Sequence, residues 1–293
     1  MTIEFSKKTG VYRSFDKTPI YYEIRGDGEP IVFVYGIGCL INHWHHQIEY
    51  FSNQRFQSIG FDLRGHHKSN PVTHLKHLSM NDLARDVIGL IKHIGHDKVH
   101  LIGHSFGTPL LLEIYREEPS VVKSMCFING FARNPIKGMF GLDVIEPFYY
   151  FIRSQYELNP DLWNTIWRLA IDNPITMHLA ALAGGFNLHL THFKDIEIYT
   201  RGVARMDLNI FLRLFEEMMN FDGTDVLETI KVPTLVIAGE GDNVTPLKFQ
   251  EEFRNMIPKA EYQLVPYGTH CTQLDFPELV NLRIEKFISN QLL

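Results

Sequence analysis

A pentapeptide in the first half of the chain has the residue types of a hydrolytic nucleophile. Residues 103–107 are Gly-His-Ser-Phe-Gly, which matches the pattern G-x-S-x-G. Apolar residues 99–102 precede it, and an apolar helical run, 108–115, follows it. The bare pattern also occurs in ordinary surface turns, but a serine turn between a strand and a helix favours a nucleophile. The pentapeptide therefore predicts Ser105 as the nucleophile, on a turn shaped by Gly103, His104 and Gly107.

A serine hydroxyl is a weak nucleophile and needs a base, which a third group must orient. Fifteen histidines are available. His270 is the candidate because it lies just after the apolar run 262–267, at a strand end where loops carry function. Asp242 follows the apolar run 234–239 in the same way, with Glu240 as the nearest alternative acid. The order serine, aspartate, histidine along the chain is typical of this arrangement. The serine, Asp242 and His270 are therefore predicted to form a catalytic triad.

Acyl transfer also needs hydrogen-bond donors for the oxyanion that forms on the substrate. Phe106, which follows the nucleophile, offers one backbone N–H. A second donor is expected from the loop after an early strand, where Tyr35-Gly36-Ile37-Gly38 follows the apolar run 31–34. The N–H groups of Ile37 and Phe106 are the predicted oxyanion hole, although the loop could also be a glycine-rich turn without a special role.

Metal and cofactor chemistry has weaker support. Several histidines crowd the N-terminal half, namely His43, His45, His46, His66 and His67. Zinc is conceivable there, but the histidines form no H-E-x-x-H, and His100 lies in an apolar strand where packing is expected. The three cysteines, Cys39, Cys126 and Cys271, are widely spaced, and no G-x-G-x-x-G follows a strand. We therefore expect activity without a metal or an organic cofactor.

Predicted strands and helices alternate along the chain, and they must bring the candidate catalytic residues together. Short apolar runs bounded by Gly or Asp predict buried strands at 31–35, 58–61, 99–102, 125–128, 234–239 and 262–267. Three- and four-residue apolar spacings predict helices at 80–94, 247–256 and 279–287, the first capped by Ser79 or Asn81. This rhythm predicts an α/β fold with a doubly wound, mostly parallel sheet.

Residues 131–222 interrupt the rhythm. They are rich in aromatic side chains and show helical spacing, with Asp207 where an N-cap belongs. We interpret them as a helical cap inserted into a core of residues 1–130 and 223–293. Its basic residues are scattered, so the cap should favour apolar substrates. Most of its aromatic side chains should pack its helices, and Phe148 and Trp167 are the first candidates to line the pocket.

Four ordered pieces of the sequence resemble the α/β-hydrolase fold superfamily, in its esterase- and lipase-like serine-hydrolase branch with a helical cap. They are GHSFG, FDLRGHHKS at 61–69, GEGDNVTP at 239–246 and GTH at 268–270. Two residues depart from the family pattern. Tyr35 stands where His is usual in the oxyanion loop, so the side-chain support of that loop must differ. His67 stands where Gly is usual, which puts the conformation of its loop in question.

The resemblance implies hydrolysis of carboxylic esters through an acyl-enzyme. The same triad also serves lactonases, thioesterases, C–C hydrolases and cofactor-free haloperoxidases, whereas epoxide hydrolases and haloalkane dehalogenases of the superfamily use an aspartate nucleophile. Ser105 argues against the latter two classes. A non-catalytic small-molecule receptor is a further alternative, because a fold does not fix a function.

Size and composition limit the remaining classes. The chain has 293 residues, 45% hydrophobic and 21% charged, with a formal net charge of −6. It carries no basic stripe, so nucleic acid is not expected as a partner. Its N-terminus lacks the apolar stretch of a signal peptide, and its apolar runs are too short for an integral membrane segment. We expect a cytoplasmic enzyme for a small apolar ester, of an oligomeric state that the sequence leaves open.

Overall fold

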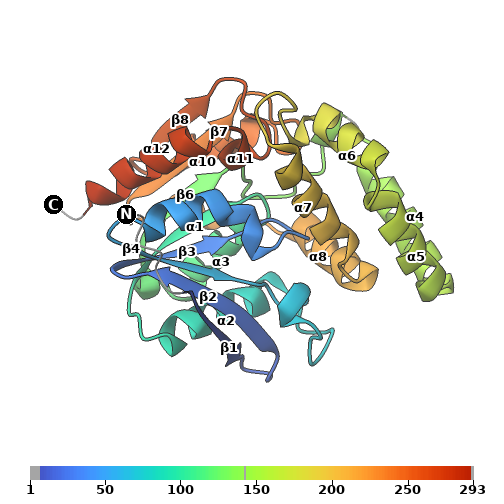
Figure 1. The fold of residues 1–293 in the computed structure, drawn as a ribbon, viewed down its shortest axis with the longest axis horizontal. Helices are drawn as coiled ribbons and strands as arrows, with labels where there is room; N and C mark the ends of the chain where they lie inside the picture. Colours follow the sequence, from blue (N-terminus) through green and yellow to red (C-terminus); the bar gives the residue numbers. More distant parts are fainter. Residues whose placement is uncertain (1–6, 142, 292–293) are drawn as a thin grey trace.

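The protein is built around one twisted sheet, seen here in a computed structural model that describes residues 7–141 and 143–291, apart from the side chains of residues 177, 180, 182 and 183. The described residues form an eight-stranded sheet of order β1-β2-β4-β3-β5-β6-β7-β8 (Figure 1). Its strands are β1 (Lys8–Arg13), β2 (Pro19–Gly26), β3 (Glu29–Val34), β4 (Phe56–Phe61), β5 (Val99–His104), β6 (Val122–Ile128), β7 (Thr234–Gly239) and β8 (Glu261–Val265).

Strands β3 to β8 run parallel, whereas β1 and β2 are antiparallel to their neighbours. The predicted α/β class with a mostly parallel sheet is confirmed. The register aligns Val34 with Gly103, and Ile128 with both His104 and Ile237. The carboxyl ends of β3, β5, β6 and β7 therefore meet at one edge of the sheet, where ligand sites of open α/β folds form.

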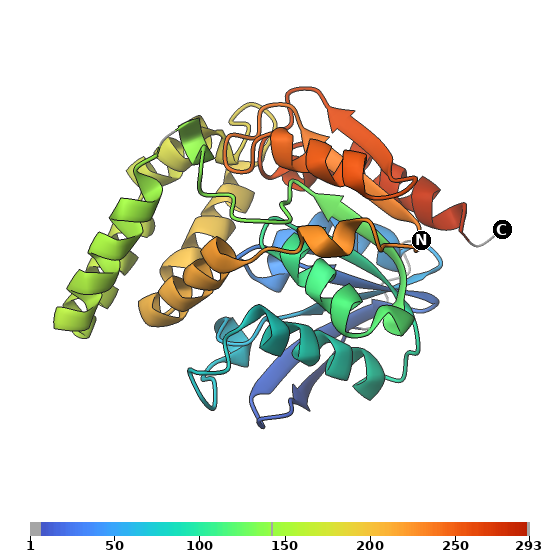
Figure 2. The same ribbon diagram turned by 180° about the vertical axis from the view of Figure 1, so that it is seen from behind.

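Helices cover both faces of the sheet. Helices α1 (His45–Ser52) and α12 (Pro277–Ser289) lie on one face, and α2 (Met80–His93), α3 (Gly107–Glu117) and α10 (Lys248–Met256) lie on the other (Figures 1 and 2). Two short helices, α9 (Thr224–Leu227) and α11 (Thr272–Asp275), complete the core. Helix α2 begins where the sequence predicts, because the Ser79 hydroxyl accepts the N–H of Asp82 in a capping box.

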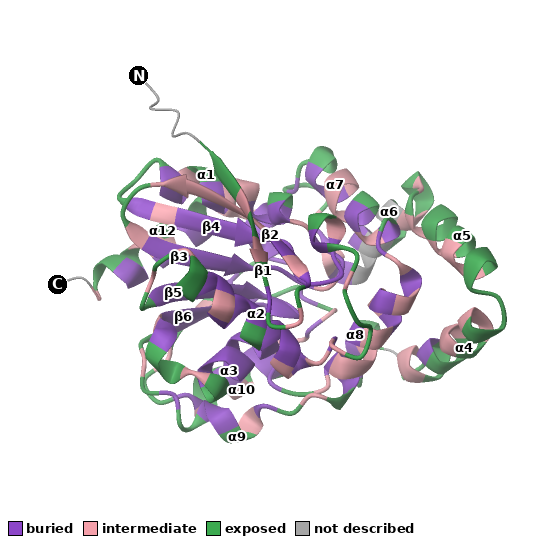
Figure 3. Cartoon of the chain, turned by 90° about the horizontal axis from the view of Figure 1, so that it is seen from below, coloured by how far each residue is buried: buried purple, intermediate pink, exposed green. Residues whose placement is uncertain are grey.

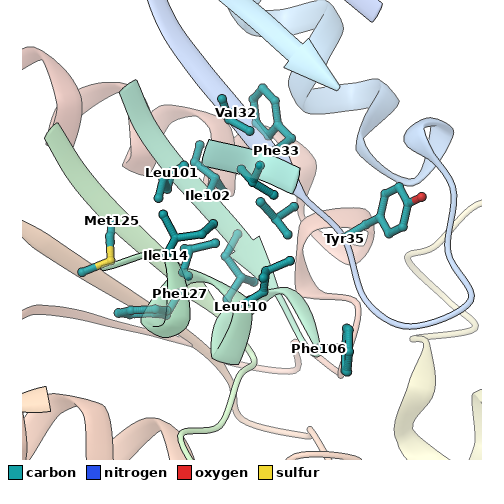
Figure 4. Close-up of a cluster of buried hydrophobic side chains, with 14 of the residues drawn as sticks. Val32, Phe33, Tyr35, Leu101, Ile102, Phe106, Leu110, Ile114, Met125 and Phe127 are labelled. Carbon is teal, nitrogen blue, oxygen red and sulfur yellow. The ribbon is translucent and has the colours of Figure 1, made fainter. Parts of the chain in front are cut away.

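The apolar core lies on both faces of the sheet, with Phe33 of β3 packed against Phe51 of α1 on one face and α3 packed on the other. Figure 4 shows Phe33, Ile102 and Phe127 from the strands together with Leu110 and Ile114 from the helix. All five side chains are buried. The packing of Leu110 and Ile114 against the sheet holds α3 next to β5, and with it the turn that joins the two elements.

The range 131–222 between β6 and β7 is called the helical segment below, and its described residues include five α-helices. These are α4 (Ile145–Leu158), α5 (Pro160–Ile171), α6 (Pro174–Ala180), α7 (Phe193–Ala204) and α8 (Leu208–Asn220). Helices α7 and α8 lie next to the core, with α4, α5 and α6 outside them (Figures 1 and 2). The outer helices are the most exposed part of the segment (Figure 3), and Leu158 on α4 is 78% exposed. The Asp207 carboxylate accepts the N–H groups of Asn209 and Ile210 and caps α8 as expected.

None of the helices in the described ranges combines the length and the apolar character that a membrane span requires.

Candidate active site

Ser105 occupies the sharp turn between β5 and α3. Its φ of 53° is left-handed, a conformation that costs a non-glycine residue free energy and is common at functional sites. The Ser105 N–H donates to the Ile128 carbonyl at 3.1 Å, which ties the turn to β6. Gly107 must be a glycine, because a Cβ there would collide with the carbonyl oxygen of Val34 on β3.

The structure brings the predicted acid and base to this serine. His270 follows β8, and its Nε2 lies 2.9 Å from the Ser105 Oγ. Asp242 follows β7, and its Oδ2 and Oδ1 lie 3.1 Å and 3.2 Å from the His270 Nδ1. The alternative acid, Glu240, is exposed and instead accepts the N–H of Tyr267 at 3.3 Å. The geometry therefore joins Ser105 to Asp242 through one imidazole.

The Asp242 carboxylate is held by three further hydrogen bonds. The N–H groups of Val244 and Thr245 donate to its Oδ1 at 2.9 Å and 2.8 Å, and the Thr245 hydroxyl donates to its Oδ2 at 2.7 Å. These bonds fix the position and orientation of the carboxylate beside His270. The carboxylate can therefore accept the His270 Nδ1–H, which leaves the Nε2 lone pair facing Ser105.

The two predicted oxyanion donors lie beside the nucleophile. Ile37 lines the same cavity as Ser105, and a Cβ on the adjacent Gly36 would lie 3.2 Å from the Ser105 Cβ. Within the described ranges, neither the Ile37 N–H nor the Phe106 N–H forms a backbone hydrogen bond. Both groups are therefore available to a ligand.

The loop around Ile37 is supported by the two residues that depart from the family pattern. The Tyr35 hydroxyl donates to Asp62 at 3.2 Å and accepts the Leu63 N–H at 2.9 Å. His67 keeps a left-handed φ of 37°, a region that glycine enters at little cost. Its Nε2 lies 3.0 Å from the Cys39 carbonyl and donates to it. The loop at 62–69 thus keeps a glycine-like turn and uses the imidazole to brace the oxyanion loop.

One residue that sequence reasoning missed holds the loop of His270, the predicted base. Asn129 follows β6 with a φ of 46° and is fully buried. Its Nδ2 donates to the carbonyls of Thr269 and His270 at 2.8 Å and 2.7 Å, and its Oδ1 accepts the Gly239 N–H at 2.7 Å. Asn129 therefore links the end of β7, which precedes Asp242, to the loop after β8 that carries His270. Its place at the end of a predicted strand was the only signal in the sequence.

A second buried residue supports the same loop. The His104 Nε2 donates to the His270 carbonyl at 2.8 Å, and its Nδ1 lies 3.2 Å from the His43 Nε2. Burial lowers the pKa of His43 to about 3, and it lowers the pKa of His104 well below its ordinary value. Both rings are therefore neutral at neutral pH, and His104 holds the backbone of His270, the predicted base.

A cavity of about 200 Å³ opens onto the serine. Its polar lining includes Ser105, Thr245 and His270. The apolar lining comes mainly from the helical segment, which contributes Phe131, Met139, Phe140, Phe186, Tyr199, Phe215 and Met218. The site can therefore hold an apolar group next to a hydroxyl, an imidazole and two free N–H donors.

The two aromatic residues first chosen for the pocket do not line this cavity. Phe148 lies on the outer helix α4 and is 60% exposed. Trp167 on α5 packs against Phe211, with ring centroids 4.6 Å apart, and its indole N–H donates to the Val203 carbonyl at 3.2 Å. That expectation is corrected: Phe140, Phe186 and Phe215 supply the aromatic wall from the helical segment.

Comparison with known sequences points to a single superfamily. The sequence model of the alpha/beta hydrolase fold matches residues 29–149. The chain is 26% identical over 266 residues to the protein named "Putative carbamate hydrolase RutD" of Azorhizobium caulinodans, an alignment that covers 89% of this chain and 92% of that protein.

Comparison with solved structures agrees at the level of the fold. A bromoperoxidase from Bacillus anthracis superposes with a TM-score of 0.75 at 19% identity, over 96% of this chain and 100% of that one. A thermophilic esterase from Thermogutta terrifontis also gives 0.75 at 19% identity, over 97% and 99% of the two chains.

Proposed function

Because the chain is a member of the α/β-hydrolase superfamily, we propose that it is a serine hydrolase that cleaves carboxylic esters with small to medium apolar acyl groups. The observation that carries the proposal is the hydrogen-bonded line from the Ser105 Oγ through His270 to Asp242. A binding protein would need no such line, because only a reaction requires a hydroxyl to lose its proton.

The proposed reaction begins with proton transfer. His270 Nε2 takes the hydroxyl proton as the Ser105 Oγ attacks the ester carbonyl, and Asp242 stabilises the imidazolium through Nδ1–H. The tetrahedral intermediate collapses, the C–O bond to the alcohol breaks, and the alcohol leaves with the proton from His270. Water then attacks the acyl-serine by the same route and restores the hydroxyl.

The backbone N–H donors beside Ser105 would stabilise the negative charge that forms on the substrate oxygen. The N–H groups of Ile37 and Phe106 would bind the oxyanion of each tetrahedral intermediate, and such a donor contributes about 3–4 kcal/mol to transition-state binding. Every step uses groups of this chain and water, so hydrolysis should need neither a metal nor an organic cofactor.

The cavity supports an apolar acyl group. Its wall from Phe186, Phe215 and Met218 offers aromatic and thioether surface, and no Lys or Arg lines it within the described residues. Burying each methylene in such a wall contributes about 0.8 kcal/mol, so kcat/KM should rise several-fold with each two added carbons until the cavity is full. The helical segment therefore acts as the cap that selects the substrate.

The test is a p-nitrophenyl ester series from acetate to octanoate, run with Ser105→Ala, His270→Ala and the wild-type chain. We expect each variant to lose activity by about 10⁴-fold or more, because triad members act as a unit. Ser120→Ala, at an exposed serine, is the matched control and should keep the wild-type rate. Glu240→Gln should also be active, whereas Asp242→Asn should be crippled.

A fluorophosphonate probe gives an independent result, since it should label the wild-type chain and spare Ser105→Ala. Retention of more than about a tenth of the rate in Ser105→Ala would overturn the serine mechanism. The related carbamate hydrolase makes an aryl carbamate a useful addition to the series. Turnover of the carbamate or of a lactone in preference to every ester would replace the substrate class while leaving the triad in place.

A further inference from the structure

Two adjacent histidines of the core meet an aspartate of the helical segment. His45 and His46 begin α1, and Asp195 lies in the first turn of α7. The His45 Nε2 lies 3.4 Å from Asp195 Oδ1, and the His46 Nε2 lies 3.2 Å from Asp195 Oδ2. The two imidazole rings lie against each other, with centroids 3.8 Å apart and planes tilted by 38°. Three side chains with metal-ligating atoms thus converge on one point outside the cavity of Ser105.

The orientation of His45 is fixed by the backbone. Its Nδ1 lies 2.9 Å from the Asn42 carbonyl oxygen, which can only accept, so Nδ1 carries the hydrogen. In the neutral ring the Nε2 lone pair then faces the Asp195 carboxylate, so two acceptors oppose each other. A ring N–H held by a backbone carbonyl, which leaves the lone pair of the other nitrogen free for an ion, is the support that metal-binding histidines usually have.

The spacing also matches that of metal ligands. Zinc bonds of about 2.0–2.2 Å to nitrogen and oxygen, at tetrahedral angles, place neighbouring ligand atoms about 3.3–3.5 Å apart. The two observed N–O distances are 3.4 Å and 3.2 Å. All three ligand groups offer atoms within 4.8 Å of one another. We propose that His45, His46 and Asp195 form a transition-metal site, suited to Zn²⁺, that joins the helical segment to the core.

The surroundings allow an ion to enter and to keep a water ligand. The side chains of His45 and His46 are 31% and 26% exposed, whereas that of Asp195 is 8% exposed. Three protein ligands leave the fourth position of tetrahedral zinc open to solvent. Because α1 and α7 are far apart in the sequence, the ion would bind only while α7 is docked, and it would stabilise that state by mass action.

A second group of possible ligands, His43, His104 and Cys271, is a poorer candidate. Its atoms also lie within 4.8 Å of one another, but all three residues are buried. The His104 Nε2 is already committed to the His270 carbonyl. Burial raises the pKa of the Cys271 thiol well above its usual value, which disfavours the thiolate that zinc requires. The group formed by His45, His46 and Asp195 is therefore the one assigned to the metal.

The experiment uses the full chain without a polyhistidine tag, stripped with a chelator and titrated with Zn²⁺ by calorimetry. We expect one zinc per chain, with a Tm that rises by about 5 °C at saturating metal. Asp195→Asn, His45→Gln and His46→Gln should each weaken zinc binding by about ten-fold or more and remove the rise in Tm. His178→Gln, at an exposed histidine of α6, is the matched control and should bind like the wild type.

Cobalt distinguishes the two groups of ligands, because a thiolate ligand adds a charge-transfer band that histidine and aspartate do not. The expected Co²⁺ spectrum has no thiolate band. The proposal is overturned if the wild type binds no zinc, which would leave a simple histidine–aspartate ion pair. It is also overturned if binding survives in all three variants, or if the thiolate band appears. Ester hydrolysis by each variant serves only as a check that it folds.

Discussion

At the scale of single residues, the position of the base depends on groups that the sequence does not mark. Ser105, Asp242 and His270 could be predicted because each follows an apolar strand in a short and specific context. Asn129 and His104 could be assigned their supporting roles only in the structure, where both donate to the His270 carbonyl. The role of Asn129 arises because β6 lies next to β7 in the sheet, and that of His104 because the end of β5 meets the loop of His270; both neighbour relations are tertiary.

Removing the Asn129 amide should therefore slow the chemistry more than it weakens binding. In Asn129→Ala the His270 and Thr269 carbonyls and the Gly239 N–H lose a partner, so the imidazole shifts relative to Ser105. We expect kcat for an activated ester to fall by about 10–100-fold, because a small misplacement of a catalytic group is costly, with KM nearly unchanged. Asn209→Ala, which removes only a side-chain amide that accepts the Arg213 Nε–H on the same helix, is the control. An unchanged kcat in a folded Asn129→Ala would contradict the positioning role.

At the scale of elements, the spacing of apolar residues predicted the positions of several strands and helices. It did not predict which helices pack next to the active site. The predicted strands at 31–35, 99–102 and 234–239 correspond to β3, β5 and β7. Strands β1 and β2 were missed because they lie at the antiparallel edge, where residues are mostly exposed or half-buried and no continuous apolar run exists.

Phe148 was wrongly predicted to line the pocket because apolar spacing does not show which neighbour a helix packs against. The apolar stripe of a helix shows that it packs against something, but not which helix lies next to the nucleophile. In the structure α8 contributes Phe215 and Met218 to the cavity, while α4 lies outside. The aromatic content of the helical segment thus predicted an apolar cavity lining, but not which residues form it.

This difference between α8 and α4 gives a paired test. Phe215→Ala should enlarge the cavity and remove apolar contact, so the ratio of kcat/KM for hexanoate over acetate esters should fall several-fold. Phe148→Ala, an identical change at an exposed position of α4, should leave that ratio unaltered. A fall in both variants, or in Phe148→Ala alone, would show that the acyl group binds elsewhere in the helical segment.

At the scale of the whole molecule, buried histidines make the stability depend on pH. Burial lowers the pKa of His43 and His66 to about 3 and that of His100 to about 4. In the unfolded chain these side chains titrate near about 6.5. Below that pH the histidines are protonated in the unfolded chain but stay neutral in the folded chain. Their contribution to stability is therefore complete above about pH 6.5 and is lost as the pH falls through the folded pKa values.

We therefore expect the free energy of unfolding to decrease steadily from about pH 6.5 towards about pH 4. Each such histidine adds up to about 1.4 kcal/mol per pH unit to the slope. Urea denaturation at a series of pH values measures it. His43→Gln should reduce the slope by the share of one histidine, whereas His178→Gln, the same change at an exposed position, should keep it. A stability that is flat across this range would contradict neutral buried rings.

The position of the helical segment between β6 and β7 also sets an order of events during synthesis. The elements that form the serine turn, β3, β5, α3 and β6, all lie before residue 129, whereas Asp242 and His270 follow the segment. At about 5–20 residues per second, roughly ten to thirty seconds separate the emergence of the serine from that of its base. A nascent chain that has not reached residue 270 therefore holds Ser105 without the complete set of groups that the proposed mechanism needs.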